Sequence, residues 1–285
     1  MKAGISSYSV SRAIKEGKMD VMQAIEWIAS IGAEHVEIVP SPFTVDMEMA
    51  GKIREKVSSL KMEISSYTIG ASFVDKTEKE HRDEIERVKK EVDIANALGV
   101  KRMRHDVAYR KPEDSTLDNF EKDLPFIVKA AREIADYAVK YGIVTSIENH
   151  GYHVQHYSRV QRVIKEVDRK NFRTTIDIGN FSVVDIDPLV GVRKNAHLAS
   201  MVHAKDFYLR KANMDPGEGF FKTAGENYCR GAIVGQGDID IREALRILKN
   251  AGYDGYLSLE FEGREDCLEG SRIGFENLKK FLKEI

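Results

Sequence analysis

The sequence predicts a single (β/α)8 barrel of the TIM type, an α/β fold. Short apolar runs alternate along the whole chain with longer stretches that have helical periodicity. Several helical stretches stop at a glycine, and the next apolar run begins one to three residues later, as in loops from a helix to a strand. The length of 285 residues also suits eight β–α units.

Eight apolar runs are predicted to be buried parallel strands, because strands covered on both faces are short and apolar throughout. They span residues 3–7, 35–40, 63–67, 101–105, 144–149, 174–178, 201–204 and 256–261. An open, doubly wound sheet is the alternative. That fold usually has a glycine-rich turn after its first strand, whereas this chain has Ser6, Ser7, Tyr8 and Ser9 and no GxGxxG.

Helices are predicted between most of these strands. Asp20 can cap a helix in which Val21, Ile25 and Ile28 share one face, and which ends at Gly32. Further helices are predicted at residues 78–98, 126–141 and 241–251, each followed directly by a glycine. No linker divides the chain, so residues 1–285 are expected to form one domain.

The segment at about 208–237, after the seventh strand, is the one irregular stretch. It contains Pro216 and several glycines, and it shows no clear periodicity. A segment of this length in a compact fold is usually a functional loop or a lid. A disordered surface insertion is the alternative.

Composition limits the function classes. Apolar residues make up 42% and charged residues 32% of the chain, and the net charge of −2 gives no field that attracts a polyanion. The two cysteines, Cys229 and Cys267, form no CxxC motif, so neither a disulfide framework nor a thiolate zinc site is expected. No signal-peptide pattern or membrane-length apolar run occurs. The expectation is a cytoplasmic enzyme or binding protein that binds neither nucleic acid nor membranes.

Four polar residues stand at the ends of the last four predicted strands: Glu148, Asp177, His203 and Glu260. The carboxyl ends of barrel strands carry the active site, so these side chains should meet around one point. Three carboxylates that close would repel one another unless a cation lay between them. Oxygen ligands with one nitrogen suit Mn²⁺, Mg²⁺, Co²⁺ or Zn²⁺. Taken singly, each residue has a plainer alternative as an ion-pair glutamate or a structural histidine.

The segments around these residues resemble the xylose isomerase-like TIM-barrel superfamily. The resemblance is carried by Ser-Ile-Glu-Asn-His at 146–150, Ile-Asp-Ile-Gly-Asn at 176–180, Val-His-Ala-Lys-Asp at 202–206, Ser-Leu-Glu at 258–260 and Gly-Gln-Gly-Asp-Ile-Asp at 235–240. The superfamily includes sugar isomerases, ketose 3-epimerases, inosose and 3-dehydroshikimate dehydratases, and endonuclease IV. The resemblance covers nearly the whole chain and is specific for fold and metal, not for substrate.

The resemblance implies a metal-dependent isomerase or epimerase of a keto-sugar or sugar derivative. Glu148, Asp177, His203 and Glu260 would bind one divalent ion, with Mn²⁺ expected first. In the epimerases the residues that match Glu148 and Glu260 face opposite sides of the substrate, where one removes a proton beside a carbonyl and the other returns it. The metal stabilises the enediolate between these steps.

This chain departs from the ketose 3-epimerases at two positions. Those enzymes have a histidine three residues after the aspartate ligand, where this chain has Asn180. They also have a substrate-binding arginine six residues after the ligand histidine, where this chain has Leu209, followed by Arg210. These differences argue against a plain ketohexose as the substrate.

Other candidates stand at or beside strand ends. His105 is predicted as a further acid or base, with a structural role as its alternative. Asp206 is expected to orient a metal ligand. The candidates for substrate binding are Lys205, Arg104, Asn180, Glu37 and His150.

Several alternatives remain open. A dehydratase uses the same metal and the same proton abstraction, followed by loss of a hydroxyl. A subunit of a complex that cleaves glycosides through a 3-keto intermediate is another. An endonuclease IV-like repair enzyme is disfavoured because Asn180 replaces a histidine and the net charge is negative. The expected partner is a small sugar-like molecule, and a homo-oligomer is an open expectation because barrels of this family are often dimers or tetramers.

Overall fold

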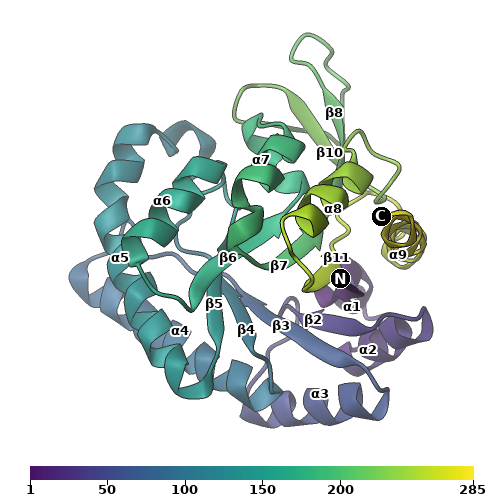
Figure 1. Cartoon of the computed structure of the whole chain (residues 1–285), viewed down its shortest axis with the longest axis horizontal. Helices are drawn as coiled ribbons and strands as arrows, with labels where there is room; N and C mark the ends of the chain where they lie inside the picture. The colour runs from purple at the N-terminus through teal and green to yellow at the C-terminus, as the bar shows by residue number, and fades with distance from the viewer.

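Eight parallel strands close into a barrel in the structure, a computed structural model that describes residues 1–285. The order around the barrel is β1-β11-β7-β6-β5-β4-β3-β2 (Figure 1), which confirms the predicted (β/α)8 fold and excludes the open sheet. The strands are β1 (Lys2–Ser6), β2 (His35–Ile38), β3 (Glu63–Ile69), β4 (Arg102–His105), β5 (Val144–Glu148), β6 (Phe172–Asp177), β7 (Ala199–Ala204) and β11 (Tyr256–Leu259).

Helices form the outer layer around this barrel (Figure 1). They are α1 (Ser11–Lys15), α2 (Val21–Ser30), α3 (Met47–Ser59), α4 (Glu78–Leu98), α5 (Leu117–Ala138), α6 (Tyr157–Val167), α7 (Pro188–Asn195), α8 (Ile241–Asn250) and α9 (Cys267–Glu284). Short 3-10 helices are η1 (Ser7–Val10), η2 (Pro112–Asp114), η3 (Val139–Tyr141), η4 (Gly179–Val184) and η5 (Ala196–Leu198).

Local capping explains several helix boundaries. Asp20 and Gln23 form a reciprocal capping box at the start of α2, as expected for Asp20. Helix α4 has the predicted bounds and ends at Gly99, whose φ of 80° lies in the left-handed region that glycine adopts without a steric penalty.

The predicted start of the next helix at residue 126 is wrong. Helix α5 begins at Leu117, because the Thr116 side chain accepts a hydrogen bond from the amide of Asn119. The helix then runs through Pro125, with buried residues such as Leu124 and Ile127 on either side of it. Burial of this apolar face outweighs the backbone hydrogen bond that proline cannot donate.

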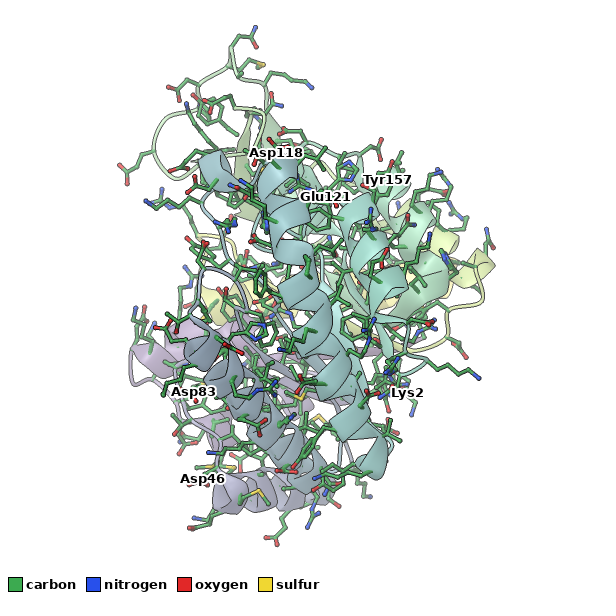
Figure 2. The ribbon with its side chains drawn as sticks, turned by 90° about the vertical axis from the view of Figure 1, so that its left-hand side faces the viewer. Lys2, Asp46, Asp83, Asp118, Glu121 and Tyr157 are labelled. Atoms are coloured by element: carbon green, nitrogen blue, oxygen red, sulfur yellow. The ribbon has the colours of Figure 1, made fainter.

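The segment predicted as an irregular loop at 208–237 contains regular structure. It contributes to a three-stranded antiparallel sheet made of β8 (Asp206–Arg210), β10 (Tyr228–Ala232) and β9 (Phe221–Lys222), in that spatial order. We call this the insertion sheet. It projects from one end of the barrel (Figure 2). The same end carries Asp118, in the first turn of α5, and Tyr157, in the first turn of α6. Helices begin at the carboxyl ends of the strands, so the insertion stands beside the face where the candidate site is expected.

One continuous apolar core joins the barrel to its helices. It contains 70 buried hydrophobic residues in a single cluster, which is consistent with one folded unit. The helices all lack the long uncharged apolar stretch that a bilayer-spanning segment needs.

Candidate metal centre

Strand register brings the four predicted ligands to one level of the barrel. Glu148 and Asp177 are the last residues of β5 and β6. Asp177 lies beside His203 in the sheet, and His203 lies beside Ser258. Glu260 follows two residues after Ser258, so it points to the same side of its strand. The register therefore directs all four side chains to the carboxyl end of the barrel interior.

These four side chains form a compact cluster, which we call the ligand cluster. One ligand atom from each of Glu148, Asp177, His203 and Glu260 can be chosen so that all lie within 4.8 Å of one another, and all four residues are buried. The Nδ1 atom of His203 is 3.4 Å from Glu148 Oε2, 3.6 Å from Glu260 Oε2 and 4.0 Å from Asp177 Oδ2.

Two buried atoms in the ligand cluster have no hydrogen-bond partner. They are Nδ1 of His203 and Oδ2 of Asp177, of which the latter lies 3.1 Å from the Lys205 ammonium as an ion pair. Buried polar atoms are rarely left unpaired, and here both face other potential ligand atoms. Three carboxylates and one imidazole nitrogen are a donor set that suits a divalent cation. The residues present therefore fit a divalent metal ion.

Two asparagines fix the geometry of the cluster. The Asn149 side chain donates to the carbonyl of Asp177 at 2.8 Å and accepts from the Asp177 amide at 2.9 Å. Asn180 donates from its side chain to Glu148 Oε1 at 2.9 Å and from its amide to Asp177 Oδ1 at 2.8 Å. Asn180, expected to contact substrate, thus holds two candidate ligands. Sequence reasoning missed the role of Asn149, although it directly follows Glu148.

Lys205 lies on the Glu260 side of the ligand cluster. Its ammonium nitrogen is 2.8 Å from Glu260 Oε2, 3.1 Å from Asp177 Oδ2 and 3.4 Å from Glu262 Oε1. Burial lowers the pKa of Lys205, but the charges of Asp177, Glu260 and Glu262 outweigh burial and hold that pKa well above its usual value. Glu262 was not predicted from sequence. It follows Glu260 by two residues, and both side chains point toward Lys205.

Arg104 lies on the opposite side, next to Glu148. Its Nε is 3.1 Å from Glu148 Oε2, and its Nη2 donates to Asp106 Oδ1 at 2.5 Å. His150 is half-exposed and approaches the same Asp106 oxygen at 3.3 Å. The structure thus brings Arg104 into direct contact with the ligand cluster and leaves His150 at its rim.

Glu37 lies behind His203 and is fully buried. Its carboxylate oxygens are 3.0 and 2.9 Å from His203 Nε2, and Oε1 also accepts a hydrogen bond from Thr68 Oγ1 at 2.6 Å. The side chain predicted to contact substrate is instead the partner of a candidate ligand.

His105 is not brought to the ligand cluster. Its ring packs against Phe73 and Phe172, and its Nδ1 lies 2.9 Å from the carbonyl of Asp106. Burial lowers the pKa of His105 to about 4. Neighbouring residues of a strand point to opposite faces, and Arg104 takes the inward face. This placement gives the predicted acid or base no contact with the cluster.

Asp206 does not orient a candidate ligand, contrary to expectation. Its carboxylate accepts hydrogen bonds from the backbone amides of Phe207, Gly235, Gly237 and Ile239. It therefore ties the start of the insertion sheet to the segment that leads into α8.

Charges within the cluster perturb the candidate ligands. Burial raises the pKa of Asp177 to about 7, against the opposing charge of Lys205. Burial would also raise the pKa of Glu148, but the charges of Arg104 and His203 hold it well below its usual value. For His203, nearby carboxylates, led by Glu37, outweigh burial and raise the pKa well above its usual value. Crowded acids that are stabilised by neighbouring cations are typical of a functional site.

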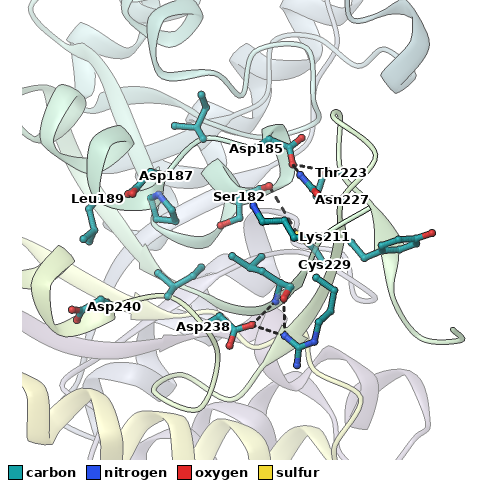
Figure 3. A pocket seen from close by; sticks show the side chains of 16 residues that line it. Ser182, Asp185, Asp187, Leu189, Lys211, Thr223, Asn227, Cys229, Asp238 and Asp240 are labelled. Atoms are coloured by element: carbon teal, nitrogen blue, oxygen red, sulfur yellow. Dashed lines mark hydrogen bonds and ion pairs between the residues drawn. The ribbon is translucent and has the colours of Figure 1, made fainter. Parts of the chain in front are cut away.

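A cavity of about 480 Å³ lies apart from the ligand cluster, between η4, the start of α7, the insertion sheet and the segment before α8 (Figure 3). Its acidic residues already have partners. Asp185 accepts hydrogen bonds from Thr223 and Asn227, and Asp238 pairs with Arg210. None of the four candidate ligands lines this cavity. It lies where β8 of the insertion sheet packs against η4.

Among curated relatives, an inosose dehydratase from Geobacillus thermodenitrificans is 24% identical to this chain over 143 residues, which are 50% of this chain and 48% of that protein. The matched region spans about half the length of each curated relative.

Solved structures share the fold along the whole chain. A D-tagatose 3-epimerase-like protein superimposes with a TM-score of 0.73 at 21% identity, covering 100% of this chain and 98% of that chain. An IOLI protein with a bound zinc atom superimposes with a TM-score of 0.76 at 17% identity, covering 100% and 97%. At these identities the likeness shows the fold alone.

The family model described as "xylose isomerase-like TIM barrel" matches residues 25–284. This match includes the ligand cluster. It leaves out β1, η1, α1 and the start of α2. The chain belongs to the xylose isomerase-like TIM barrel family.

Proposed function

We propose that this chain is a divalent-metal-dependent isomerase or epimerase of a keto-sugar or sugar derivative. The observation that carries the proposal is the ligand cluster, in which three buried carboxylates and one imidazole converge within 4.8 Å. Mn²⁺ is the proposed ion, and Zn²⁺, Mg²⁺ or Co²⁺ would suit the same donor set. When bound, such an ion supplies a Lewis acid that polarises a carbonyl and stabilises the negative charge that develops on its oxygen.

Glu148 and Glu260 are the proposed acid and base. They reach the cluster from β5 and from the residue after β11, two strands that are separated in the barrel by β6 and β7. Each has its own cation, because Arg104 contacts Glu148 and Lys205 contacts Glu260. One carboxylate would remove a proton next to the carbonyl and leave an enediolate, and the other would return a proton.

Lys205 and Arg104 are also placed to bind substrate oxygens. Both side chains are almost fully buried. Arg104 has N–H donors beyond those that contact Glu148 and Asp106, whereas Lys205 would exchange its longest carboxylate contact, 3.4 Å to Glu262, for a substrate oxygen. A substrate hydroxyl that lies over the ligand cluster would meet a donor on each side. Asn180 and His150 would supply further polar groups for binding the substrate.

The insertion sheet is proposed to cover the site. The Tyr152 hydroxyl, from the loop after β5, donates to the carbonyl of Lys222 in β9 at 3.1 Å. The insertion therefore reaches across to the loop that also carries His150. A cover over the site would exclude water from an enediolate.

A metal-dependent dehydratase is the second candidate. The inosose dehydratase matched above is a relative in sequence, and proton abstraction next to a carbonyl is common to both reactions. The two differ in whether a β-hydroxyl leaves after the proton has been removed.

Incubation of the Mn²⁺-loaded protein with ketoses and 3-oxo sugar derivatives in heavy water tests the proposal. Deuterium next to the carbonyl without loss of water supports isomerisation or epimerisation, and loss of water supports the dehydratase. Glu148→Gln and Glu260→Gln should each lower the exchange rate about 10²–10⁴-fold. Glu91→Gln, whose carboxylate accepts a hydrogen bond from Tyr67 on the outer face of the barrel, is the matched control. Equal exchange in all four proteins would contradict the proposal.

A further inference from the structure

Glu37 and His203 are joined across the barrel interior by a contact that links residues 166 positions apart in the chain. Glu37 stands in β2 and His203 in β7, and β1 and β11 lie between these strands. The contact cannot arise from local chain geometry. It requires the closed barrel.

Glu37 points inward from β2, beside the neighbouring strand β3. The pairing of β2 with β3 shifts after Val36, because β3 has an extra residue, Ser65, that has no partner in β2. This bulge resets the β3 side chains that follow it, Thr68 among them, and such bulges are common beside functional sites. Thr68 in β3 then fixes the carboxylate by donating to Glu37 Oε1 at 2.6 Å.

The two ring nitrogens of His203 have different surroundings. Nε2 faces the Glu37 carboxylate at 3.0 and 2.9 Å, while Nδ1 faces the other members of the ligand cluster without a hydrogen-bond partner. A carboxylate can only accept a hydrogen bond, so Nε2 must carry the proton in this contact. The remaining lone pair of the neutral ring is then on Nδ1.

We infer that Glu37 is a positioning residue that selects Nδ1 of His203 as the metal-binding atom and raises the metal affinity of the ligand cluster. The inference rests on the function proposed above, since it needs the cluster to hold a metal ion. Carboxylates that accept a hydrogen bond from a ligating histidine orient its ring and increase its basicity. Glu37 acts through His203 Nε2, on the side of the ring away from the Nδ1 atom that faces the ligand cluster.

Metal titration separates this role from a structural one. Metal-free protein is titrated with Mn²⁺ alone, and free Mn²⁺ is measured by electron paramagnetic resonance. Glu37→Gln should weaken Mn²⁺ binding about 10–100-fold. Thr68→Val, which removes one support of the carboxylate but keeps Glu37, should weaken it less. Glu91→Gln is the matched control, because Glu91 accepts a hydrogen bond from Tyr67 on the outer face and should leave the affinity unchanged.

A second measurement reads the ring directly and does not depend on activity. In Zn²⁺-loaded protein, long-range ¹H–¹⁵N spectra should show the His203 proton on Nε2 and the metal on Nδ1. Loss of one imidazole signal in His203→Asn assigns the ring. Metal on Nε2, or equal Mn²⁺ affinity in Glu37→Gln and wild type, would overturn the inference while leaving the proposed function intact. Absence of Mn²⁺ binding in the wild type would overturn both.

Discussion

Lys205 and Asp177 form an ion pair of 3.1 Å inside the ligand cluster. The same Asp177 oxygen lies 4.0 Å from Nδ1 of His203, on the side that faces the other candidate ligands. A divalent ion bound in the cluster and the Lys205 ammonium would therefore both interact with the Asp177 carboxylate. Lys205 stabilises the crowded carboxylates and would compete with the proposed metal ion for them.

Lys205→Met should consequently have opposite effects on the two states. The metal-free protein should lose about 3 kcal/mol of unfolding free energy, because removing one partner leaves buried carboxylates uncompensated. Mn²⁺ affinity should rise about tenfold, equivalent to about 1.4 kcal/mol, because the competing cation is gone. Urea unfolding and Mn²⁺ titration measure the two effects. Lys222→Met, which breaks an exposed pair with Glu226, should change neither by more than about 0.5 kcal/mol. Weaker Mn²⁺ binding in Lys205→Met would argue against competition.

Metal binding should stabilise the fold. A ligand at about 100 times its Kd raises the unfolding free energy by about 2.7 kcal/mol when only the folded state binds it. Mn²⁺ should therefore raise the Tm of the wild type, and a chelator should reverse the shift. Asp177→Asn removes one candidate ligand and should reduce the shift to near zero. A Tm that Mn²⁺ does not change would indicate that the folded cluster binds no ion.

Acid should destabilise the protein partly through His105. Its pKa falls from 6.5 to about 4 on folding because of burial. Between these values the unfolded chain binds a proton that the folded chain does not, so stability falls as pH decreases from 6.5 to 4. The loss attributable to His105 is about 3 kcal/mol at most.

His105→Phe should remove this part of the pH dependence and keep the ring packing against Phe73 and Phe172. The slope of unfolding free energy against pH should become shallower but not vanish, because burial also lowers the pKa of His35 to about 4. Exposed His197→Asn is the control. Metal affinity should stay unchanged, and a large loss of exchange activity in His105→Phe would restore its predicted role as acid or base.

Asp206→Asn should loosen the insertion sheet without affecting metal binding. An amide presents one acceptor and one donor group to the four backbone donors now bound by the carboxylate. The loss should be about 3 kcal/mol, since hydrogen bonds to a charged group are strong and unpaired buried groups are costly. Hydrogen exchange should speed up most near Gly235 and Gly237. Asp215→Asn, at an exposed turn where the carboxylate accepts a hydrogen bond from the amide of Gly217, should have a much smaller effect.

The four candidate ligands could be predicted from sequence because each stands at, or within one residue of, the carboxyl end of a strand. Parallel strands in a barrel all present their carboxyl ends at one rim, so position in the chain translates directly into position in space. Glu148 and Asp177 illustrate this, since both are the final residues of their strands.

Side-chain direction was harder to predict. Arg104 and His105 are adjacent at the end of β4, and sequence reasoning treated both as candidates. A one-residue difference in strand phase exchanges the inner and outer faces, and only the register of the closed barrel places Arg104 inside. Glu37 and His203 are both candidates from sequence, but their contact with each other is not predictable from it, because that contact depends on barrel closure. The insertion sheet was missed because its strands are short and joined by long turns.

Anomalous diffraction from crystals grown with Mn²⁺, with matched crystals of Glu148→Gln, tests the ligand cluster most directly. The account predicts one strong peak per chain, bonded to oxygens of Glu148, Asp177 and Glu260 and to Nδ1 of His203, and a weak or absent peak in the variant. No peak at this position in the wild type, with Mn²⁺ in the crystal at concentrations far above any expected Kd, would contradict it.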